Sequence, residues 1–246
     1  MCLITTVTNM HAGQEFDNVG PGFLSNNYST SVYENATIGT RLEQLNIGAL
    51  CIDNTAVTYS TNATAFSIDS TSGVISTAQS LDYETQQLYQ FPIEARGASR
   101  TYTANITIIV LDVNDNSPVF NQLVYTSTLP SGALTEWSTA VLATDQDSGS
   151  NAAITYSITD GDTAGIFAIN STTGEIGATG TLDAGKFSNF ILIVNATDGG
   201  NPIRNDQVAV VIFVPCGSKA PRHSARLPLY ALLISLALLV SAALGM

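Results

Sequence analysis

The chain has few basic residues, few histidines and few cysteines. Lysine and arginine account for only 8 of its 246 residues, against 20 acidic residues, and the net charge is −12. Because phosphate backbones are bound by clustered basic side chains, this balance excludes nucleic acid as a partner. The three cysteines, Cys2, Cys51 and Cys216, are odd in number and far apart in the sequence, so they define no disulfide framework.

The sequence also lacks the motifs of common enzyme sites. Its two histidines, His11 and His223, lie in the segments that flank the patterned part of the chain. No glycine-rich phosphate loop, zinc-ligand spacing or nucleophile elbow occurs. We therefore expect no catalytic residues and no enzymatic activity.

Two halves of the chain repeat each other. Residues 66–76 align with residues 167–177, both of which contain a Phe-x-Ile triplet followed by a polar turn and a glycine. The same offset aligns Leu81-Asp82 with Leu182-Asp183. A period of about 100 residues is too long for a solenoid and is typical of tandem domains.

Within each repeat the sequence favours short strands. Apolar and polar residues alternate over 89–95, and similar segments cover 102–111, 188–196 and 207–214, separated by clusters of Gly, Asn, Asp and Ser. Pro92 cannot donate to a sheet ladder, so it predicts a bulge or an edge. The pattern predicts an all-β fold, with two tandem Greek-key seven-stranded β-sandwich domains followed by a C-terminal hydrophobic helix.

The stretch 111–118 places acidic and amide side chains between an alternating strand and a proline. Asp112, Asn114, Asp115 and Asn116 are hard oxygen donors in a segment that is too polar to be core. Oxygen ligands of this kind are those that Ca²⁺ prefers. The stretch resembles the interdomain linker of cadherins, and the resemblance extends over about residues 24–215.

The resemblance implies a calcium site built from three parts of the chain. Residues 32–40 resemble the Pro-Glu-Asn motif, with Tyr33 in place of the proline, and 81–84 resemble the Leu-Asp-Arg-Glu motif. Residues 143–151 resemble the Asp-x-Asp motif, whereas an EF-hand is excluded there because Tyr156 stands where a bidentate glutamate is needed. The implied ligands of about three calcium ions are Glu34, Asp82, Glu84, Asp112, Val113, Asn114, Asp115, Asn116, Asp145, Asp147, Asn151 and Asp198, with main-chain carbonyls used at Val113, Asn116 and Asn151.

Eight of these ligands are carboxylates, and their repulsion gives the site a mechanical role. Two carboxylates 4 Å apart repel by roughly 4 kcal/mol at an effective dielectric constant of 20. We expect the joint to be loose without calcium and stiff with it, at an affinity of about 10⁻⁴–10⁻³ M per ion. The outer ends of the repeats depart from the family pattern: Arg96-Gly97 stands where Thr197-Asp198 stands in the second repeat, so we expect one competent joint.

Several features indicate an extracellular protein. Asn-x-Ser/Thr sequons, which are acceptors for N-glycosylation, occur at Asn27, Asn35, Asn62, Asn105, Asn170 and Asn195. Alternation over 102–108 turns Asn105 outward. The only tryptophan, Trp137, lies inside the second repeat, and we expect it to have a packing role rather than a role in strand exchange.

The two ends of the chain have different characters. Residues 1–23 lack the basic start of a signal peptide, and we interpret them as a degenerate remnant of a preceding repeat. The domains expected after it are repeat 1 over 24–120 with its linker at 111–118, repeat 2 over 121–216, a polar spacer over 217–226 and a hydrophobic tail over 227–246.

The tail has two membrane interpretations. Twenty predominantly apolar residues span about 30 Å as a helix, which is enough for a single transmembrane segment. Small residues at Gly217 and Ser218, a polar spacer and a terminal apolar run also match a signal for a glycosylphosphatidylinositol (GPI) anchor. The basic residues Lys219, Arg222 and Arg226 precede the tail and none follows it, which favours the GPI interpretation.

These features lead to one main functional hypothesis and two alternatives. We expect a plasma-membrane protein whose extracellular repeats mediate calcium-dependent cell–cell adhesion, with cadherin repeats on an opposing cell as homophilic partners. The first alternative is a non-adhesive, calcium-stiffened stalk or receptor fragment. The second is a decayed fragment without an adhesive face. Aggregation of protein-coated beads with and without calcium discriminates adhesion from the other two.

Overall fold

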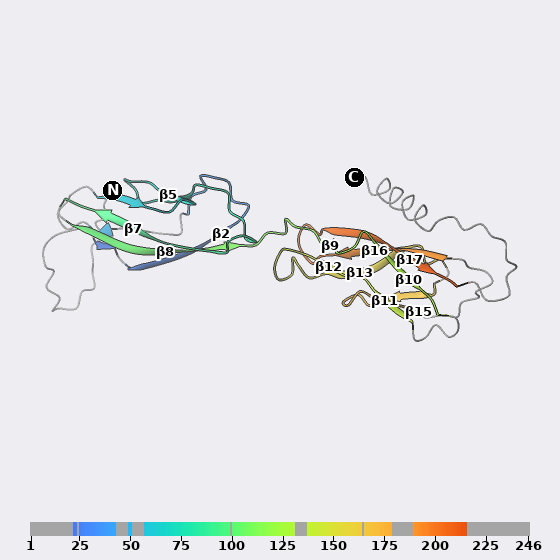
Figure 1. The fold of residues 1–246 in the computed structure, drawn as a ribbon. Coiled ribbons are helices and arrows are strands. Elements are labelled where there is room, and N and C mark those ends of the chain that lie inside the picture. The colour runs from blue at the N-terminus through green and yellow to red at the C-terminus, as the bar shows by residue number, and fades with distance from the viewer. Residues whose placement is uncertain are drawn as a thin grey trace, which may run out of the picture. The chain divides into compact units, whose positions relative to one another are not determined.

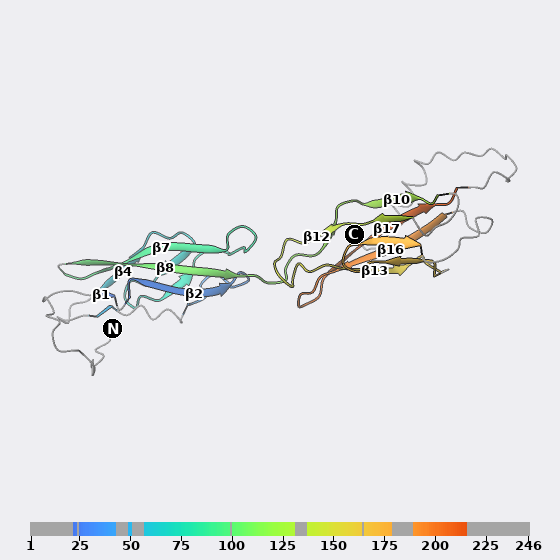
Figure 2. The same cartoon turned by 90° about the horizontal axis from the view of Figure 1, so that it is seen from below.

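The computed structural model describes residues 22–23, 25–42, 49–50, 57–98, 100–130, 137–163, 165–178 and 189–215. The chain divides into two compact units, Met1–Val113 and Asn114–Met246. Each unit is built from strands and turns, and the described residues contain no helix (Figures 1 and 2). The predicted all-β class is therefore confirmed. The predicted helix over 227–246 lies outside the described residues, as do residues 1–21 and the spacer.

No helix long and apolar enough to cross a membrane is found among the residues that the structure describes. The cysteines and the two small residues proposed for a GPI anchor lie outside the described part of the chain. The membrane interpretation of the tail consequently stays a prediction.

The main sheet of the first unit has four strands in the order β2-β8-β7-β4 (Figure 2). They are β2 (Asn27–Tyr33), β8 (Thr101–Leu111), β7 (Leu88–Arg96) and β4 (Thr58–Thr61). β2 runs parallel to its neighbour β8, whereas the pairs β8–β7 and β7–β4 are antiparallel. The remaining strands form the pairs β5 (Phe66–Ile68) with β6 (Ile75–Thr77) and β1 (Gly22–Phe23) with β3 (Ala49–Leu50).

Alternation along β8 explains how this sheet acquires one buried face. Ala104, Ile106 and Ile108 are buried, while the intervening residues of the strand face outward. Opposite them, Phe66 stacks on Phe91 with ring centroids 5.5 Å apart. Burial of an isoleucine or phenylalanine side chain contributes about 1.5–3 kcal/mol, so this face is the main source of the unit's stability.

Pro92 lies at an edge without a bulge. The register between β7 and β8 is continuous through Pro92, which lies opposite Asn105. On its other side, β4 ends with Thr61 opposite Ile93, so no residue of β4 pairs with Pro92. The missing N–H therefore interrupts no ladder, and of the two predicted alternatives the edge is right and the bulge is wrong.

The main sheet of the second unit repeats this arrangement in the order β10-β17-β16-β13. Its strands are β10 (Val124–Thr128), β17 (Asn205–Phe213), β16 (Asn189–Thr197) and β13 (Thr155–Asp160), again with the first strand parallel to the last. A three-stranded sheet follows the order β11 (Ser138–Ala140), β15 (Glu175–Ala178) and β14 (Phe167–Ile169). A short pair joins β12 (Ala143–Thr144) to β9 (Val119–Phe120).

The second core contains the tryptophan. Trp137 is buried and meets Phe167 edge-to-face at 5.9 Å, and Phe167 in turn meets Phe190 at 5.1 Å. Such aromatic pairs add about 0.5–1.5 kcal/mol each beyond their buried area. The expected packing role of Trp137 is confirmed.

The aligned segments 66–76 and 167–177 form the same turn. In the first unit the side chain of Asp69 accepts hydrogen bonds from the main-chain N–H groups of Thr71 and Ser72. Asn170 does the same in the second unit. Gly174 has a φ of 70°, and a Cβ there would collide with the carbonyl oxygen of Val141, so this turn requires glycine.

Candidate metal centre

Glu34 is a buried carboxylate at the end of β2 and is held by main-chain donors. Its own N–H donates to the carbonyl of Leu111 at 3.1 Å, which continues the pairing of β2 with β8. Its Oε1 accepts from the N–H of Val113 at 2.8 Å, and its Oε2 accepts from the N–H of Tyr83 at 2.6 Å. The side chain is 5% exposed, so the fold fixes this charge in place.

Glu84 lies between two other acids of the first unit, Glu34 and Asp112. Glu84 offers a carboxylate oxygen within 4.8 Å of one from Glu34, and it also lies within 4.8 Å of an oxygen from Asp112. Carboxylates at this spacing repel one another by several kcal/mol at an intermediate dielectric constant unless a cation lies among them. The first unit thus gathers three of its predicted ligands.

Asp82 organises the turn that presents Glu84. Its Oδ1 accepts from the N–H of Glu84 at 3.1 Å, and its Oδ2 accepts from the hydroxyl of Thr85 at 2.7 Å. The bond from the Thr85 hydroxyl is the main cause that holds the pKa of Asp82 below its usual value. Asp82 is therefore ionised at neutral pH and remains a candidate ligand in its own right.

The second unit carries a matching acidic set. Asp145 and Asp147 follow β12, and the Asp147 N–H donates to Oδ1 of Asp145 at 3.1 Å. Burial raises the pKa of Asp145, and the negative charges of Asp147 and Asp198 raise it further. Perturbed pKa values of this kind cluster at functional sites, so this acidic set is a candidate site.

Asp198 follows β16 and ties down the loop behind it. Its Oδ1 accepts from the N–H groups of Gly200 at 3.2 Å and Arg204 at 3.0 Å, while its Oδ2 accepts from the side chain of Asn114 at 3.0 Å. Burial alone would raise its pKa, but these hydrogen bonds, that of Arg204 first, outweigh burial and hold the pKa below its usual value. Asp198 is thus the firmly ionised member of the set.

The linker residues of the second unit contact the same acids. The main-chain N–H of Asn116 donates to the Asp147 carboxylate at 3.2 and 3.3 Å, and its side chain donates to that carboxylate at 2.8 Å. Asp115 is exposed and accepts from the Asn116 side chain at 2.9 Å. Asn151 lies in the turn after Asp147, and its N–H donates to the carbonyl of Ser148.

Arg204 is a residue of the site that sequence reasoning missed. Its Nε donates to the main-chain carbonyl of Asn114 at 2.9 Å, and its main-chain N–H bonds to Asp198. The side chain of Asn114 also donates to the carbonyl of Pro202. The spacing between Asp198 and Arg204 matches no known ligand motif, so the sequence did not mark Arg204. The loop between the two residues, which includes the cis peptide Asn201–Pro202, brings Arg204 to the linker.

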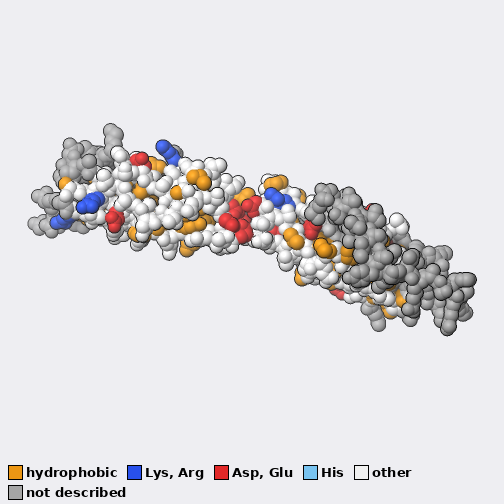
Figure 3. Space-filling view, turned by 45° about the horizontal axis from the view of Figure 1, so that its top comes forward, with side chains coloured by type: hydrophobic (Ala, Val, Ile, Leu, Met, Phe, Trp, Pro, Cys, Tyr) orange, Lys and Arg blue, Asp and Glu red, His pale blue; other side chains and the backbone are white. Residues whose placement is uncertain are grey.

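The donors in this set fit a hard cation. Oδ1 of Asn114 and Oδ2 of Asp145 are buried and have no hydrogen-bond partner in the structure. A buried oxygen without a partner costs about 1–3 kcal/mol, and more when it carries charge. A calcium ion, which takes six to eight oxygen ligands from carboxylates, amides and main-chain carbonyls, would satisfy both atoms. Figure 3 shows acidic side chains gathered at the linker end of the first unit, on a face that is otherwise mostly uncharged.

The predicted glycosylation acceptors do not join this set. Asn27 and Asn105 lie in β2 and β8, Asn62 follows β4, and Asn195 lies in β16. Asn35 is exposed next to Glu34, and Asn170 is exposed in the turn after β14. They are therefore distributed over both units rather than assembled at one place.

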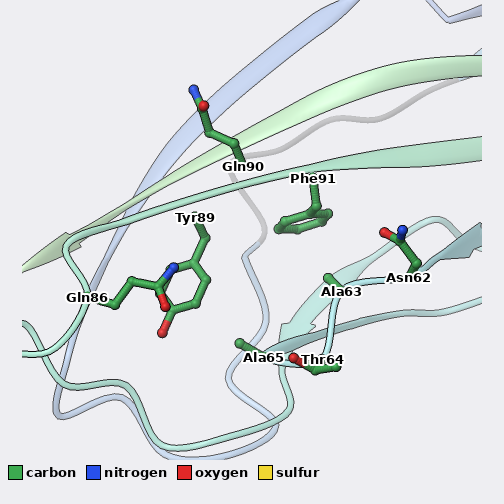
Figure 4. A pocket seen from close by; sticks show the side chains of 8 residues that line it. All are labelled: Asn62, Ala63, Thr64, Ala65, Gln86, Tyr89, Gln90 and Phe91. Carbon is green, nitrogen blue, oxygen red and sulfur yellow. The ribbon is translucent and has the colours of Figure 1, made fainter.

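One pocket of the first unit lies away from the acids. It has a volume of about 310 Å³, and the rings of Tyr89 and Phe91 line it, whereas Gln90 points away from these rings (Figure 4). The other lining residues are Asn62, Ala63, Thr64, Ala65 and Gln86. The pocket contains no acidic, basic or nucleophilic pair, so its chemistry does not resemble a catalytic site.

Comparison with known proteins places both units in one family. The Cadherin domain model matches residues 28–111 and 125–215. The chain is similar to human Protocadherin Fat 1, with 36% identity over 203 residues, and to the Drosophila melanogaster Protocadherin-like wing polarity protein stan, with 34% identity over 227 residues. These matches cover 79% and 82% of this chain but only 4% and 6% of the relatives.

Solved structures agree with this assignment. The structure of mouse Cadherin-23 EC22-24 is similar at a TM-score of 0.71 and 29% identity, covering 79% of this chain and 64% of that one. Human Protocadherin-24 EC1-2 is similar at a TM-score of 0.68 and 28% identity, covering 81% of this chain and 99% of that one.

Proposed function

Because the chain belongs to the cadherin family, we propose that its two repeats bind calcium at their linker and serve in calcium-dependent cell–cell adhesion. Cadherin repeats are non-enzymatic adhesion and structural domains, and the relatives are cadherins and protocadherins of the cell surface. The family thus supports an extracellular, adhesion-type role. The ligands, the number of ions and the homophilic partner are part of the proposal.

One observation supports the calcium site most directly. Two oxygens of the second unit, on Asn114 and Asp145, are buried without hydrogen-bond partners, and Asp145 is repelled by two neighbouring carboxylates. Buried oxygens without partners cost free energy, and the repulsion at Asp145 indicates that the local shortage is of positive charge rather than of a neutral donor. The first unit presents the same shortage around Glu84, which has acidic neighbours on two sides.

Calcium would supply the positive charge that both acidic sets lack. We assign the ligands to Glu34, Asp82, Glu84 and Asp112 from the first repeat and to Asp115, Asp145, Asp147 and Asp198 from the second. The linker contributes the side-chain oxygen of Asn114 and the carbonyls of Val113 and Asn116, and Asn151 contributes its own carbonyl. Since Val113 and Asn114 are consecutive, ions held by both sets would restrict the linker dihedral angles and stiffen the joint.

Calorimetry tests the site. Titration of the purified chain with calcium is expected to show about three ions, with affinities of about 10⁻⁴–10⁻³ M. Magnesium should compete poorly, because it demands octahedral geometry and keeps its water ligands. A chain that binds no calcium at 10 mM would sink this part of the proposal.

Adhesion needs a separate test. Beads coated with the ectodomain are expected to aggregate in calcium and to disperse when calcium is chelated. The second candidate is a calcium-stiffened spacer without self-association. It is favoured by one observation: the matched region is only 4–6% of each of the two long relatives, so most of their length lies outside these two repeats. Monomers that bind calcium but leave beads dispersed would support the spacer.

Attachment to the plasma membrane is proposed from the sequence of the tail. Either residues 227–246 span the bilayer or they direct GPI attachment at Gly217 or Ser218. Phosphatidylinositol-specific phospholipase applied to intact cells discriminates the two. Release of the protein is expected for a GPI anchor, and retention on the cells is expected for a transmembrane segment.

A further inference from the structure

Two glycosylation sequons that are far apart in the sequence lie side by side in the first unit. Asn27-Tyr28-Ser29 lies in β2 and Asn105-Ile106-Thr107 lies in β8. The parallel register pairs Asn27 with Asn105, although they are 78 residues apart in the chain. Their side chains approach each other, with Nδ2 of Asn105 at 3.5 Å from Oδ1 of Asn27.

Both asparagines point away from the core. Each is exposed, whereas Ala104 and Ile106, the neighbours of Asn105 in β8, are buried at 2% and 0%. In a strand successive side chains point to opposite faces, so the buried neighbours fix the outward direction of Asn105. Neither amide is needed to support a buried group.

We propose that Asn27 and Asn105 both carry an N-linked oligosaccharide, and that this glycan pair closes the adjoining half of the sheet's outer face to protein partners. In the reaction, a bond forms between the amide Nδ2 and C1 of the first sugar, and the bond from C1 to the pyrophosphate of a polyprenyl-linked donor breaks. The lipid pyrophosphate leaves and the amide loses one proton. No oxidation or reduction is involved.

Folding order makes double occupancy feasible. Asn27 enters the secretory compartment before β8 exists, so β2 cannot yet be paired with it when the glycosylating enzyme meets that sequon. Each modified amide keeps its Oδ1 and one N–H, and the 3.5 Å contact between the two asparagines is at the outer limit of a hydrogen bond. Modification of both therefore removes little that stabilises the folded repeat.

The surroundings of the pair suit a glycan more than a protein interface. Next to Asn105 on β7 lies the exposed Pro92, and Gln90 reaches towards Thr107 at 3.5 Å. The exposed large apolar side chains of this face, Leu88, Ile109 and Tyr33, lie at least four positions farther along their strands, about 13 Å or more from the asparagines. Glycans are bulky and strongly hydrated, so they would occupy the polar half of the face.

The experiment uses the full chain secreted by eukaryotic cells behind a cleavable leader. Glycosidase treatment in heavy-oxygen water converts each occupied asparagine to a labelled aspartate, which peptide mass spectrometry locates. We expect label at both Asn27 and Asn105 in most molecules. Folded, secreted protein that is unlabelled at either position would overturn the proposal.

Matched variants show the effect on intact protein. Ser29→Ala and Thr107→Ala destroy the sequons but keep the asparagines, and each is expected to remove one glycan in a gel-mobility assay. Ser29→Thr and Thr107→Ser preserve the sequons and should migrate as the parent chain. If the alanine variants also migrate unchanged, no glycan is present and the proposal fails.

Bead aggregation tests the proposal that the glycan pair closes half of the outer face of this sheet to protein partners. Beads coated with the Ser29→Ala/Thr107→Ala double variant should aggregate within about twofold of the parent, because the partner does not use this face. A loss of aggregation with an unchanged melting curve would show that the face, or its glycans, takes part in adhesion and would overturn this part. If parent beads do not aggregate at all, the proposed adhesive function fails, while the glycan pair is still decided by mass spectrometry.

Discussion

Glu34 accepts a hydrogen bond from the main-chain N–H of Val113 at 2.8 Å, across 79 residues of sequence. Its second oxygen accepts from the N–H of Tyr83, so one buried carboxylate joins the end of β2, the turn before β7 and the start of the linker. The residue predicted as a calcium ligand is thus also a structural centre of the first repeat. Each role can be measured by its own experiment.

Replacing Glu34 by glutamine should damage both roles. The amide retains one acceptor oxygen, so one of the two N–H groups loses its partner, at a cost of about 1–3 kcal/mol in the free energy of unfolding. Calcium affinity should fall at least tenfold, because one charge is lost. Urea unfolding without calcium and calorimetry with calcium measure the two effects.

The exposed Glu94 in β7 provides the control, and Glu94→Gln should change neither quantity by more than about 0.5 kcal/mol. Unfolding of Glu34→Gln at the same urea concentration as the parent chain would contradict the structural role.

Asp115→Ala should separate calcium binding from folding. Asp115 is exposed and its side chain accepts a hydrogen bond from the neighbouring Asn116, so the variant should fold as the parent chain does without calcium. Calcium at 10 mM is about 10 to 100 times the proposed dissociation constant, so one ion stabilises the folded chain by about 1.4–2.7 kcal/mol, and this gain should be lost. Melting curves by circular dichroism, with and without 10 mM calcium, measure it.

Glu175→Ala, at another exposed acid of the second repeat, should keep the full response to calcium. If Asp115→Ala still gains as much stability from calcium as the parent chain, then Asp115 is not a ligand and the assignment of the joint is wrong.

The calcium-free second repeat should become more stable on mild acidification. The pKa of Asp145 is raised in the folded state by burial and by the charges of Asp147 and Asp198. The folded state therefore binds a proton more readily than the unfolded state, and the penalty from Asp145 appears as the pH rises from its unfolded pKa through its folded pKa. Asp145→Asn should raise the calcium-free melting temperature at pH 7 and abolish the calcium response.

In strong acid Asp198 acts oppositely, because its pKa is lowered in the folded state and the stability that it contributes is lost as the pH falls through that lower value. The gain from Asp145→Asn should shrink as the pH is lowered through the raised pKa of Asp145, because the protonated parent side chain carries no charge for the substitution to remove. A gain that is constant from pH 3 to pH 7 would refute the electrostatic cause.

Asp69 should make its turn sensitive to acid, whereas Asn170 should not. The main-chain N–H of Ser72 at 2.7 Å is the largest cause that lowers the pKa of Asp69, followed by the Ser72 hydroxyl at 2.8 Å. The stability that Asp69 contributes is present above its unfolded pKa of 3.8 and is lost as the pH falls through the lower folded value.

Asp69→Asn recreates the turn of the second repeat, in which Asn170 accepts from Thr172 and Thr173. The variant should be slightly less stable than the parent at pH 7 and equal to it near pH 2. Urea unfolding at a series of pH values measures this convergence. Two curves that stay parallel over the whole range would show that Asp69 does not act through its charge.

Asn195 should remain unglycosylated in the folded chain. Its Nδ2 donates to Thr197, the threonine of its own sequon, at 2.7 Å, and its Oδ1 is buried without a hydrogen-bond partner. A chain that acquires an oligosaccharide on this amide before folding has to accommodate it beside half-buried neighbours, so we expect such chains to be rare in the folded, secreted protein. Mass spectrometry after deglycosylation should find no label at Asn195. The exposed Asn170 serves as the comparison. A labelled Asn195 would contradict this prediction.

The sequence by itself determined the all-β class and the two repeats, and it pointed to most of the acidic residues that make up the candidate metal centre. These depend on local patterns: the period of two along β8 fixes which residues are buried, and the order of motifs fixes which acids follow which strands. Local patterns are readable because neighbouring residues in a strand must point to opposite faces.

The tertiary structure decided which distant residues meet. Strand pairing places Asn27 beside Asn105, and the loop from Asp198 to Arg204 brings an arginine to the carbonyl of Asn114. Neither contact can be predicted from the spacing of residues along the sequence. The register of two strands 78 residues apart is set by the packing of a whole core and not by the residues between them. For the same reason the sequence marked Glu34 as a ligand, while only the fold showed that two main-chain N–H groups hold it in place.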